Sequence, residues 1–196
     1  MKKFIYFLGL LFVMTLALPT TGVAQVNQST KKEQRKLEKQ KKQKQRQKRN
    51  LASREFYSKL IQSKQWVFQA TGLYGPYGQY YSVSPTLNFV AVHNNKIIVQ
   101  FGFEGVIGWN GVGGVTAEGF LSDFKFNPGK NKNQAMTVSA HIQPKYGGGS
   151  PYFTMYINND GSAQISVTLI NGGVLQMNGQ VYTPAQSSVY KGTTFP

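Results

Sequence analysis

Residues 136–169 read MTVSAHIQPKYGGGSPYFTMYINNDGSAQISVTL, and apolar and polar side chains alternate along most of this stretch. A period of two is typical of β-strands that bury one face. Residues 158–161 (Asn-Asn-Asp-Gly) interrupt the alternation with a strong hairpin signal. The stretch therefore predicts antiparallel strands joined by tight turns.

The same period extends outward from this stretch in both directions. Further alternating runs occur at 66–71, 87–91, 97–103, 120–126 and 175–177. Long parallel crossovers are absent, so we expect an all-β fold, an antiparallel meander of about eight strands over residues 65–196. Periodicity does not choose between its closure into a barrel and its folding as a sandwich.

A helical period precedes the strands. Phe56, Tyr57, Leu60 and Ile61 form an apolar stripe within residues 50–64. Asn50 and Ser53 fit equally well as the residue that caps its start. We expect a short amphipathic helix that packs onto the all-β domain.

Residues 25–49 form a separate, strongly basic segment. Its part at 31–49 holds 11 Lys and Arg against two Glu, and Leu37 is its one apolar residue. The composition fits either a solvated helix or a disordered segment, and neither form inserts an apolar face into a membrane. Two roles stay open, a soluble spacer and an arm that binds an anionic envelope surface. The arm would use basic residues near the middle of the segment: Lys39, Lys41, Lys42, Lys44 and Arg46.

The first 24 residues have the pattern of a cleavable signal peptide. Lys2 and Lys3 precede an uncharged apolar run at 4–18, and residues 22–24 (Gly-Val-Ala) fit a processing site. We expect cleavage after Ala24, export to the periplasm or the cell exterior, and no transmembrane span in the processed chain. A retained short membrane anchor is the alternative. The basic segment behind the cleavage site argues against simple export, because positive charge close behind an apolar segment tends to stay cytoplasmic, but the small residues of the processing site favour export. Nucleic acid is a poor partner for an exported chain whose basic segment has no aromatic residues.

Candidate ligand-binding residues lie in loops and in a glycine-rich run. Tyrosines interrupted by glycine and proline offer contact surfaces for a small apolar or glycan ligand, although they serve equally well as packing. The glycine-rich run 102–119 fits a bulged barrel corner, or else a ligand rim with Trp109 as a contact. The ligand-binding candidates are Tyr74, Tyr77, Tyr80, Tyr81, Trp109 and Glu118.

The sequence offers little catalytic chemistry. His93 and His141 are far apart and fit surface positions, and no nucleophile, metal or phosphate-binding motif occurs. Glu118 and Asp123 are five residues apart on one strand, so we expect them on opposite faces. We therefore expect no catalytic residues, metal or cofactor, and a binding module rather than an enzyme. A structural or interaction protein is the second hypothesis, and an unrecognised hydrolase around Glu118 is the third.

Several stretches together resemble a known family. They are the basic tract KKEQRKLEKQKK, QWVFQA at 65–70, NFVAV at 88–92, NGVGGVTAEG at 110–119 and VYKG at 189–192. With the signal peptide, these stretches make the chain similar to domain of unknown function family 4251, over nearly its whole length. The resemblance implies an exported protein of Gram-negative bacteria with an all-β domain. It implies no activity and no functional residues.

Overall fold

A computed structural model describes residues 21–75, 77–102, 111, 113–146, 149–168 and 172–192 of the chain, with side chains described from Thr30 onward. The chain forms two compact units, Met1–Gln47 and Lys48–Pro196. Its described elements in chain order are α2 (Thr21–Gln62), β1 (Gln65–Tyr74), β2 (Tyr80–Ser82), β3 (Phe89–His93), β4 (Lys96–Phe101), β5 (Val115–Asn127), β6 (Met136–Pro144), β7 (Tyr152–Ile157), β8 (Ser162–Thr168), β9 (Val174–Tyr182) and the 3-10 helix η1 (Pro184–Gln186).

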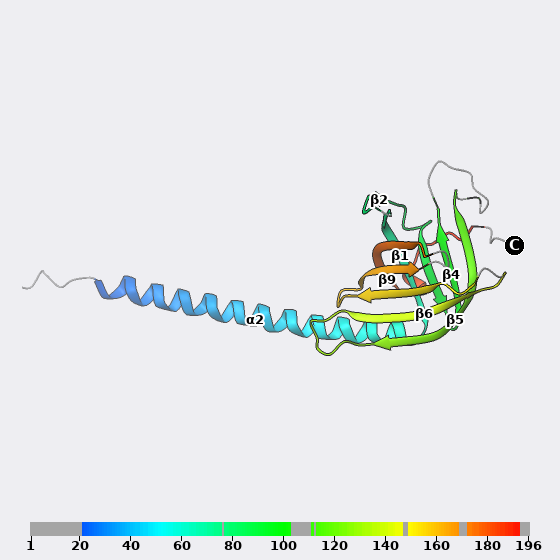
Figure 1. Ribbon diagram of the computed structural model, residues 1–196. Coiled ribbons are helices and arrows are strands. Elements are labelled where there is room, and N and C mark those ends of the chain that lie inside the picture. Colours follow the sequence, from blue (N-terminus) through cyan, green and yellow to red (C-terminus); the bar gives the residue numbers. More distant parts are fainter. Residues whose placement is uncertain are drawn as a thin grey trace, which may run out of the picture. The chain divides into compact units, whose positions relative to one another are not determined.

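The strands form a closed antiparallel barrel (Figure 1). Hydrogen-bonded neighbours follow the order β2-β1-β3-β4-β5-β6-β7-β8-β9, and β1 pairs in addition with β9. That last pairing extends from Val67 opposite Tyr182 to Tyr74 opposite Gln176. It closes eight strands into a barrel, and β2 adds a short extra strand beside β1. The predicted all-β meander is confirmed, and of its two closures the chain adopts the barrel.

Strand β1 pairs along both edges because its two halves have different partners. On one edge, residues 65–69 pair with β3 and residues 72–74 pair with β2, while β9 occupies the other edge. The register against β9 shifts between Ala70 and Gly72, as expected for a β-bulge that bends a strand at a barrel corner. Gly179 of β9 lies so close to β1 that an added Cβ would overlap the carbonyl oxygen of Gln69.

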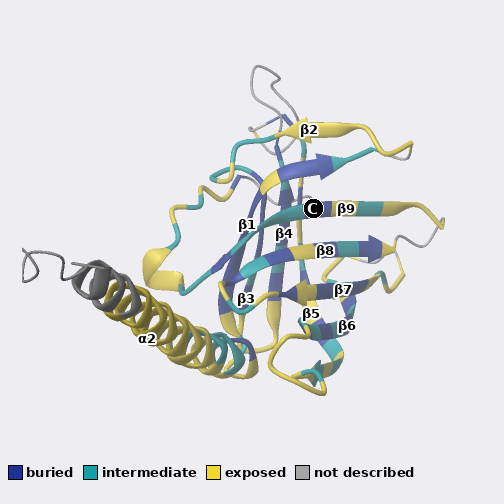
Figure 2. Cartoon of the chain, turned by 90° about the vertical axis from the view of Figure 1, so that its left-hand side faces the viewer, coloured by how far each residue is buried: buried dark blue, intermediate teal, exposed yellow. Residues whose placement is uncertain are grey.

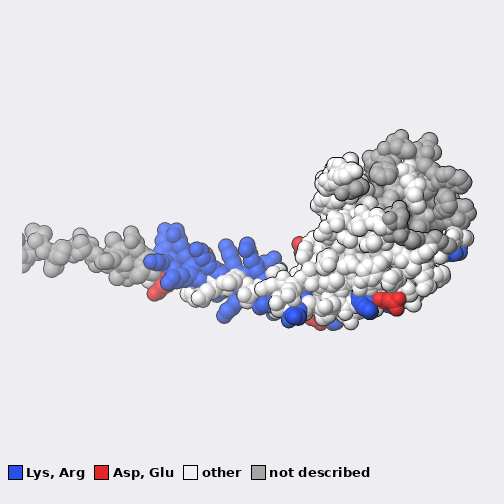
Figure 3. Space-filling view, in the orientation of Figure 1, with Lys and Arg blue, Asp and Glu red and all other residues white. Residues whose placement is uncertain are grey.

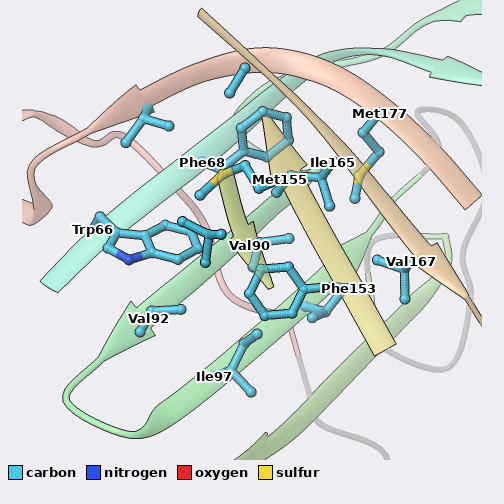
Figure 4. Close-up of a cluster of buried hydrophobic side chains, with 14 of the residues drawn as sticks. Trp66, Phe68, Val90, Val92, Ile97, Phe153, Met155, Ile165, Val167 and Met177 are labelled. Carbon is cyan, nitrogen blue, oxygen red and sulfur yellow. The ribbon is translucent and has the colours of Figure 1, made fainter. Parts of the chain in front are cut away.

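The barrel interior is packed with apolar side chains (Figure 4). Trp66, Phe68 and Phe153 point inward from β1 and β7, and each is at most 1% exposed. Alternate residues of the other strands complete this core: Val90, Val92, Ile97, Val138, Met155, Ile165, Val167 and Met177. Burial largely alternates with the two-residue period of the sequence along β6, β7 and β8, whereas residues 66–70 of β1 are all buried (Figure 2).

One continuous helix precedes the barrel. α2 runs from Thr21 to Gln62 without a break, so the basic segment is helical rather than disordered, and the amphipathic stretch is its end rather than a separate helix. Asn50 and Ser53, the two candidate caps, lie inside it. The reason is local, because no glycine or proline stands between residues 25 and 62 and good helix formers flank both polar residues.

The last turns of α2 cover one end of the barrel. Ile61 is fully buried in the barrel core, and Tyr57 and Leu60 pack against it. Arg54 donates from Nη1 to the Gln134 carbonyl oxygen at 2.8 Å and to Asn159 Oδ1 at 2.7 Å. These contacts join the helix to the β5–β6 loop and to the β7–β8 turn. Tyr57, Leu60 and Ile61 of the predicted apolar stripe therefore pack on the domain, whereas Phe56 is 47% exposed.

The contact between Tyr57 and the β7–β8 turn can be tested at Gly161. Gly161 has φ of +83°, and an added Cβ would overlap the Tyr57 ring. Gly172 has φ of +80° with nothing within 4 Å of an added Cβ. We expect Gly172→Ala to cost about 1–2 kcal/mol of unfolding free energy from backbone strain alone, and Gly161→Ala to cost roughly 1–3 kcal/mol more from overpacking.

Urea denaturation of the two variants measures this difference. In a Tyr57→Ala background the excess cost of Gly161→Ala should disappear. Equal losses for the two glycine variants would contradict the packing of the helix on this turn.

Candidate functional site

A groove on the outer wall of the barrel brings charged side chains of three segments of the chain together. We call it the Lys–Glu groove. It has a volume of about 230 Å³, and its lining comes from β4, β5 and the residue that follows β6: Lys96, Ile97, Ile98, Glu118, Gly119, Phe120 and Lys145. The sequence pointed to Glu118 as a ligand contact but not to the two lysines beside it.

The strand register explains why these side chains meet. Lys96 is opposite Phe120, and Ile98 is opposite Glu118, in the β4–β5 pair. The Lys145 amide donates to the Glu118 carbonyl oxygen at 2.9 Å. This bond extends the β5–β6 pairing by one residue past the end of β6 and brings Lys145 next to Glu118. Directly opposite residues have Cβ atoms about 5 Å apart, so Lys96, Ile98, Glu118 and Phe120 form one compact patch.

Glu118 is held in its ionised form. Lys191, from the segment after η1, donates a hydrogen bond to the Glu118 carboxylate. This bond lowers the pKa of Glu118; burial opposes the shift, and the charges of Lys191, Lys145 and Lys96 add to it. The lowered pKa means that the ion pair contributes stability above the unfolded pKa of Glu118 and loses it as the pH falls through the folded value.

The Lys145 ammonium is held in its charged form. Its Nζ lies 4.9 Å from the centroid of the Tyr146 ring. The pKa of Lys145 is raised, chiefly by a hydrogen bond to the Tyr146 side chain and to a smaller extent by the Glu118 charge, while burial opposes the shift. The groove therefore keeps a positive charge on this side over the physiological pH range.

A strap of residues 187–192 crosses the outer wall beside the groove and is fixed by Gln100. The fully buried Gln100 amide donates from Nε2 to the Tyr190 carbonyl oxygen at 2.8 Å, and its Oε1 accepts from the Gly192 amide at 2.8 Å. Gln100 also donates to the Leu87 carbonyl oxygen at 3.0 Å and accepts from Thr116 Oγ1 at 2.9 Å. The strap carries Lys191 to Glu118, so Gln100 positions the third lysine of the groove.

The candidate tyrosines lie on β1, on β2 and in the turn between them. The rings of Tyr74 and Tyr80 meet edge to face with centroids 5.4 Å apart. The Tyr80 ring also covers Gly72, where an added Cβ would overlap it. Tyr77 is 90% exposed, and Tyr81 is 55% exposed. Tyr80, although it packs on Tyr74 and Gly72, is still 53% exposed, so Tyr77, Tyr80 and Tyr81 all present surface to solvent.

The structure does not bring the tyrosines and Glu118 together. Strand β1 is separated from β5 by β3 and β4, which corresponds to about 14 Å across the sheet. Trp109, the remaining candidate of this group, lies outside the described residues.

The other polar candidates are also dispersed. Asp123 has φ of +52° at a register shift of β5, so the simple alternation expected between Glu118 and Asp123 does not hold there. His93 ends β3, and His141 lies on β6 with its ring centroid 5.0 Å from that of Tyr152. Within the described ranges, no group of three or more His, Asp or Glu side chains is arranged to hold a metal ion.

The basic residues of α2 are fully available to solvent. Every residue from Thr30 to Ala52 is exposed, including Lys39, Lys41, Lys42, Lys44 and Arg46. Leu37 is 55% exposed. Figure 3 shows the Lys and Arg side chains gathered along this helix, while the face of the barrel in that view is largely uncharged. In the part of the chain that the structure describes, we find no helix with the length and apolar character of a membrane span.

The comparisons with known proteins place this geometry in a family. Residues 48–181 match the family described as Domain of unknown function (DUF4251). The chain belongs to the DUF4251 family. It is similar to the crystal structure of a DUF4251 family protein from Bacteroides eggerthii DSM 20697, with 27% sequence identity and a TM-score of 0.54 over 69% of this chain and 91% of that chain. A search of the curated proteins finds no match. The family resemblance expected from the sequence is confirmed.

The role of the Gln100 amide in fixing the strap can be tested by an apolar replacement. Gln100→Leu would leave buried backbone groups of Leu87, Tyr190 and Gly192 without partners, and we expect it to lower the unfolding free energy by about 2–4 kcal/mol. The exposed Gln143 on β6 provides the matched control, Gln143→Leu.

Urea denaturation measures the loss of stability, and the rate of trypsin cleavage after Lys191 measures the release of the strap. Gln100→Leu should speed this cleavage, because the strap is released. A variant as stable and as protease-resistant as Gln143→Leu would contradict the assignment.

Proposed function

We propose that this chain is an exported binding protein of the cell envelope, held on an anionic membrane surface by its basic helix. The observation that carries the proposal is the uninterrupted exposure of α2 over its basic tract at 31–49. Membership of the DUF4251 family, a domain of unknown function, does not indicate an activity.

The charge of the helix suits adsorption to a surface rather than insertion into it. The tract at 31–49 contains 11 basic and two acidic residues, spread over about 28 Å of helix at 1.5 Å per residue. Each Lys or Arg close to an anionic bilayer contributes about 1 kcal/mol of attraction. Leu37, the one apolar residue, offers no apolar face that would enter the hydrocarbon. The shared chemistry of its targets is membrane phosphate, carried by phospholipid or by lipopolysaccharide.

The barrel serves as the binding module on its outside rather than in its interior. The described interior positions are filled by Trp66, Phe68, Phe153 and their neighbours. Glu118, the acidic side chain of the outer groove, is ionised and paired with Lys191. A carboxylate held in this way suits charge recognition better than general acid catalysis, which needs a pKa near the working pH.

Export rests on the signal-peptide pattern of residues 1–24. We expect the protein isolated from its own host to begin at Gln25, because residues 22–24 supply the small side chains of a processing site. N-terminal sequencing or intact mass measurement checks this. A mature chain that retains Met1 would overturn the export proposal without affecting the membrane-binding proposal.

Membrane binding can be measured with vesicles in flotation assays. We expect the processed protein to bind vesicles that contain 30% anionic lipid, to bind lipopolysaccharide aggregates, and to ignore neutral phosphatidylcholine vesicles. Replacing Lys39, Lys41, Lys42, Lys44 and Arg46 by Gln should weaken binding to anionic vesicles at least about 100-fold, given about 1 kcal/mol for each charge.

The β5 strand and the loop after it provide the matched control. Lys125, Lys130 and Lys132 changed to Gln remove three charges from the barrel and should leave vesicle binding within about twofold of the wild type. If the variant with five helix substitutions still binds anionic vesicles like the wild type, the helix is not the membrane-binding segment. Binding to lipopolysaccharide but not to phospholipid, or the reverse, would identify the surface.

A further inference from the structure

The Lys–Glu groove has charged and apolar lining residues that suit a second binding site, separate from the basic helix. We propose that it binds an acidic sugar, namely a pyranose that carries a carboxylate or a phosphate group. The inference goes beyond the membrane-binding function, because it concerns the outer wall of the barrel and a soluble ligand.

Charge in the groove is positive and only partly neutralised. Lys191 and Glu118 neutralise each other as an ion pair. Lys96 and Lys145 also line the groove, and neither forms a salt bridge with any carboxylate in the described part of the chain. Two lysines that line one groove can supply charge-assisted hydrogen bonds to a single anionic group.

The register places an apolar surface beside these charges. Phe120, opposite Lys96 in the β4–β5 pair, is 47% exposed, and Ile98 also lines the groove. An exposed aromatic ring packs against the C–H face of a pyranose, as aromatic side chains do with flat, partly apolar ligands. The combination of ammonium groups and an aromatic ring matches a charged sugar better than an inorganic anion or an apolar molecule.

The size of the groove limits its occupant. Its volume of about 230 Å³ lies below the ~300–1,000 Å³ of sites that enclose drug-sized ligands. The groove thus accommodates one sugar unit, either free or at the end of a longer glycan.

The negative charge of Glu118 lowers the affinity of this site for an anionic ligand. This charge lies directly among the lysines and occupies Lys191. Removing that charge frees the third ammonium for the ligand. An anion site therefore predicts that Glu118→Gln binds more tightly, whereas a site in which Glu118 accepts a hydrogen bond from a neutral sugar predicts weaker binding.

Isothermal titration of the full processed chain tests the proposal with four probes: glucuronate, glucose 6-phosphate, glucose and inorganic phosphate. We expect at least one of the two acidic sugars to bind at least about tenfold more tightly than both glucose and inorganic phosphate, a difference that corresponds to about 1.4 kcal/mol. Which acidic sugar binds identifies the anionic group. Equal binding of glucose, equal binding of inorganic phosphate, or no binding of either acidic sugar at 10 mM would overturn the proposal.

Variants locate the site and separate it from the membrane surface. Lys96→Gln combined with Lys145→Gln should weaken binding of the acidic sugar at least about tenfold, and Lys132→Gln, outside the groove lining, should leave it unchanged. Glu118→Gln should strengthen it about three- to tenfold. The variant with five helix substitutions should bind the sugar like the wild type even though it no longer binds anionic vesicles.

Circular dichroism and thermal unfolding show whether each variant is folded. If the double lysine variant is folded and retains full affinity, or if Glu118→Gln weakens binding, the groove is not an acidic-sugar site.

Discussion

Closure of the sheet through β1 and β9 is the constraint on which the rest of the molecule depends. In a closed barrel every strand has one face turned inward, and here the described inward positions hold large apolar side chains such as Trp66, Phe68 and Phe153. Polar groups are then left to the outer wall and to the two ends. The end next to α2 is covered by Tyr57, Leu60 and Ile61. Charged side chains therefore lie on the outer wall, where β4 and β5 contribute to the Lys–Glu groove.

Buried amides give that outer wall its shape. Gln69, Asn88 and Gln100 are each at most 5% exposed. Asn88 bonds both to the Ser84 carbonyl oxygen and to the backbone of Gly102, while Gln69 donates to the Pro85 carbonyl oxygen. Such side chains satisfy backbone groups of segments that have no strand partner. The irregular segment before β3 and the strap at 187–192 are thereby held against the sheet without adding to its core.

The sequence predicted what depends on local periodicity. Alternation at 136–143 and the Asn-Asn-Asp-Gly turn at 158–161 are local signals, and the strands and the hairpin follow them. Barrel closure depends on β1 meeting β9, which no local pattern encodes. The single helix was missed because Asn50 and Ser53 look like caps, although the surrounding residues are good helix formers. Glu118 was found as an isolated acid, but its lysines come from three distant positions in the chain, and only the strand register and the strap bring Lys96, Lys145 and Lys191 to it.

The β1–β9 pairing also has a consequence for the time course of folding. Val67 and Tyr182 are partners at opposite ends of the barrel sequence, and contacts of such long range form slowly because the intervening chain must first lose its freedom. Until they form, β1 and β9 each present unpaired backbone groups that another chain can join. In the folded barrel this pair of strands is hydrogen-bonded, whereas an open barrel would expose both edges to other chains. The lifetime of the open barrel, more than the stability of the native state, would then set how much of the protein aggregates during production.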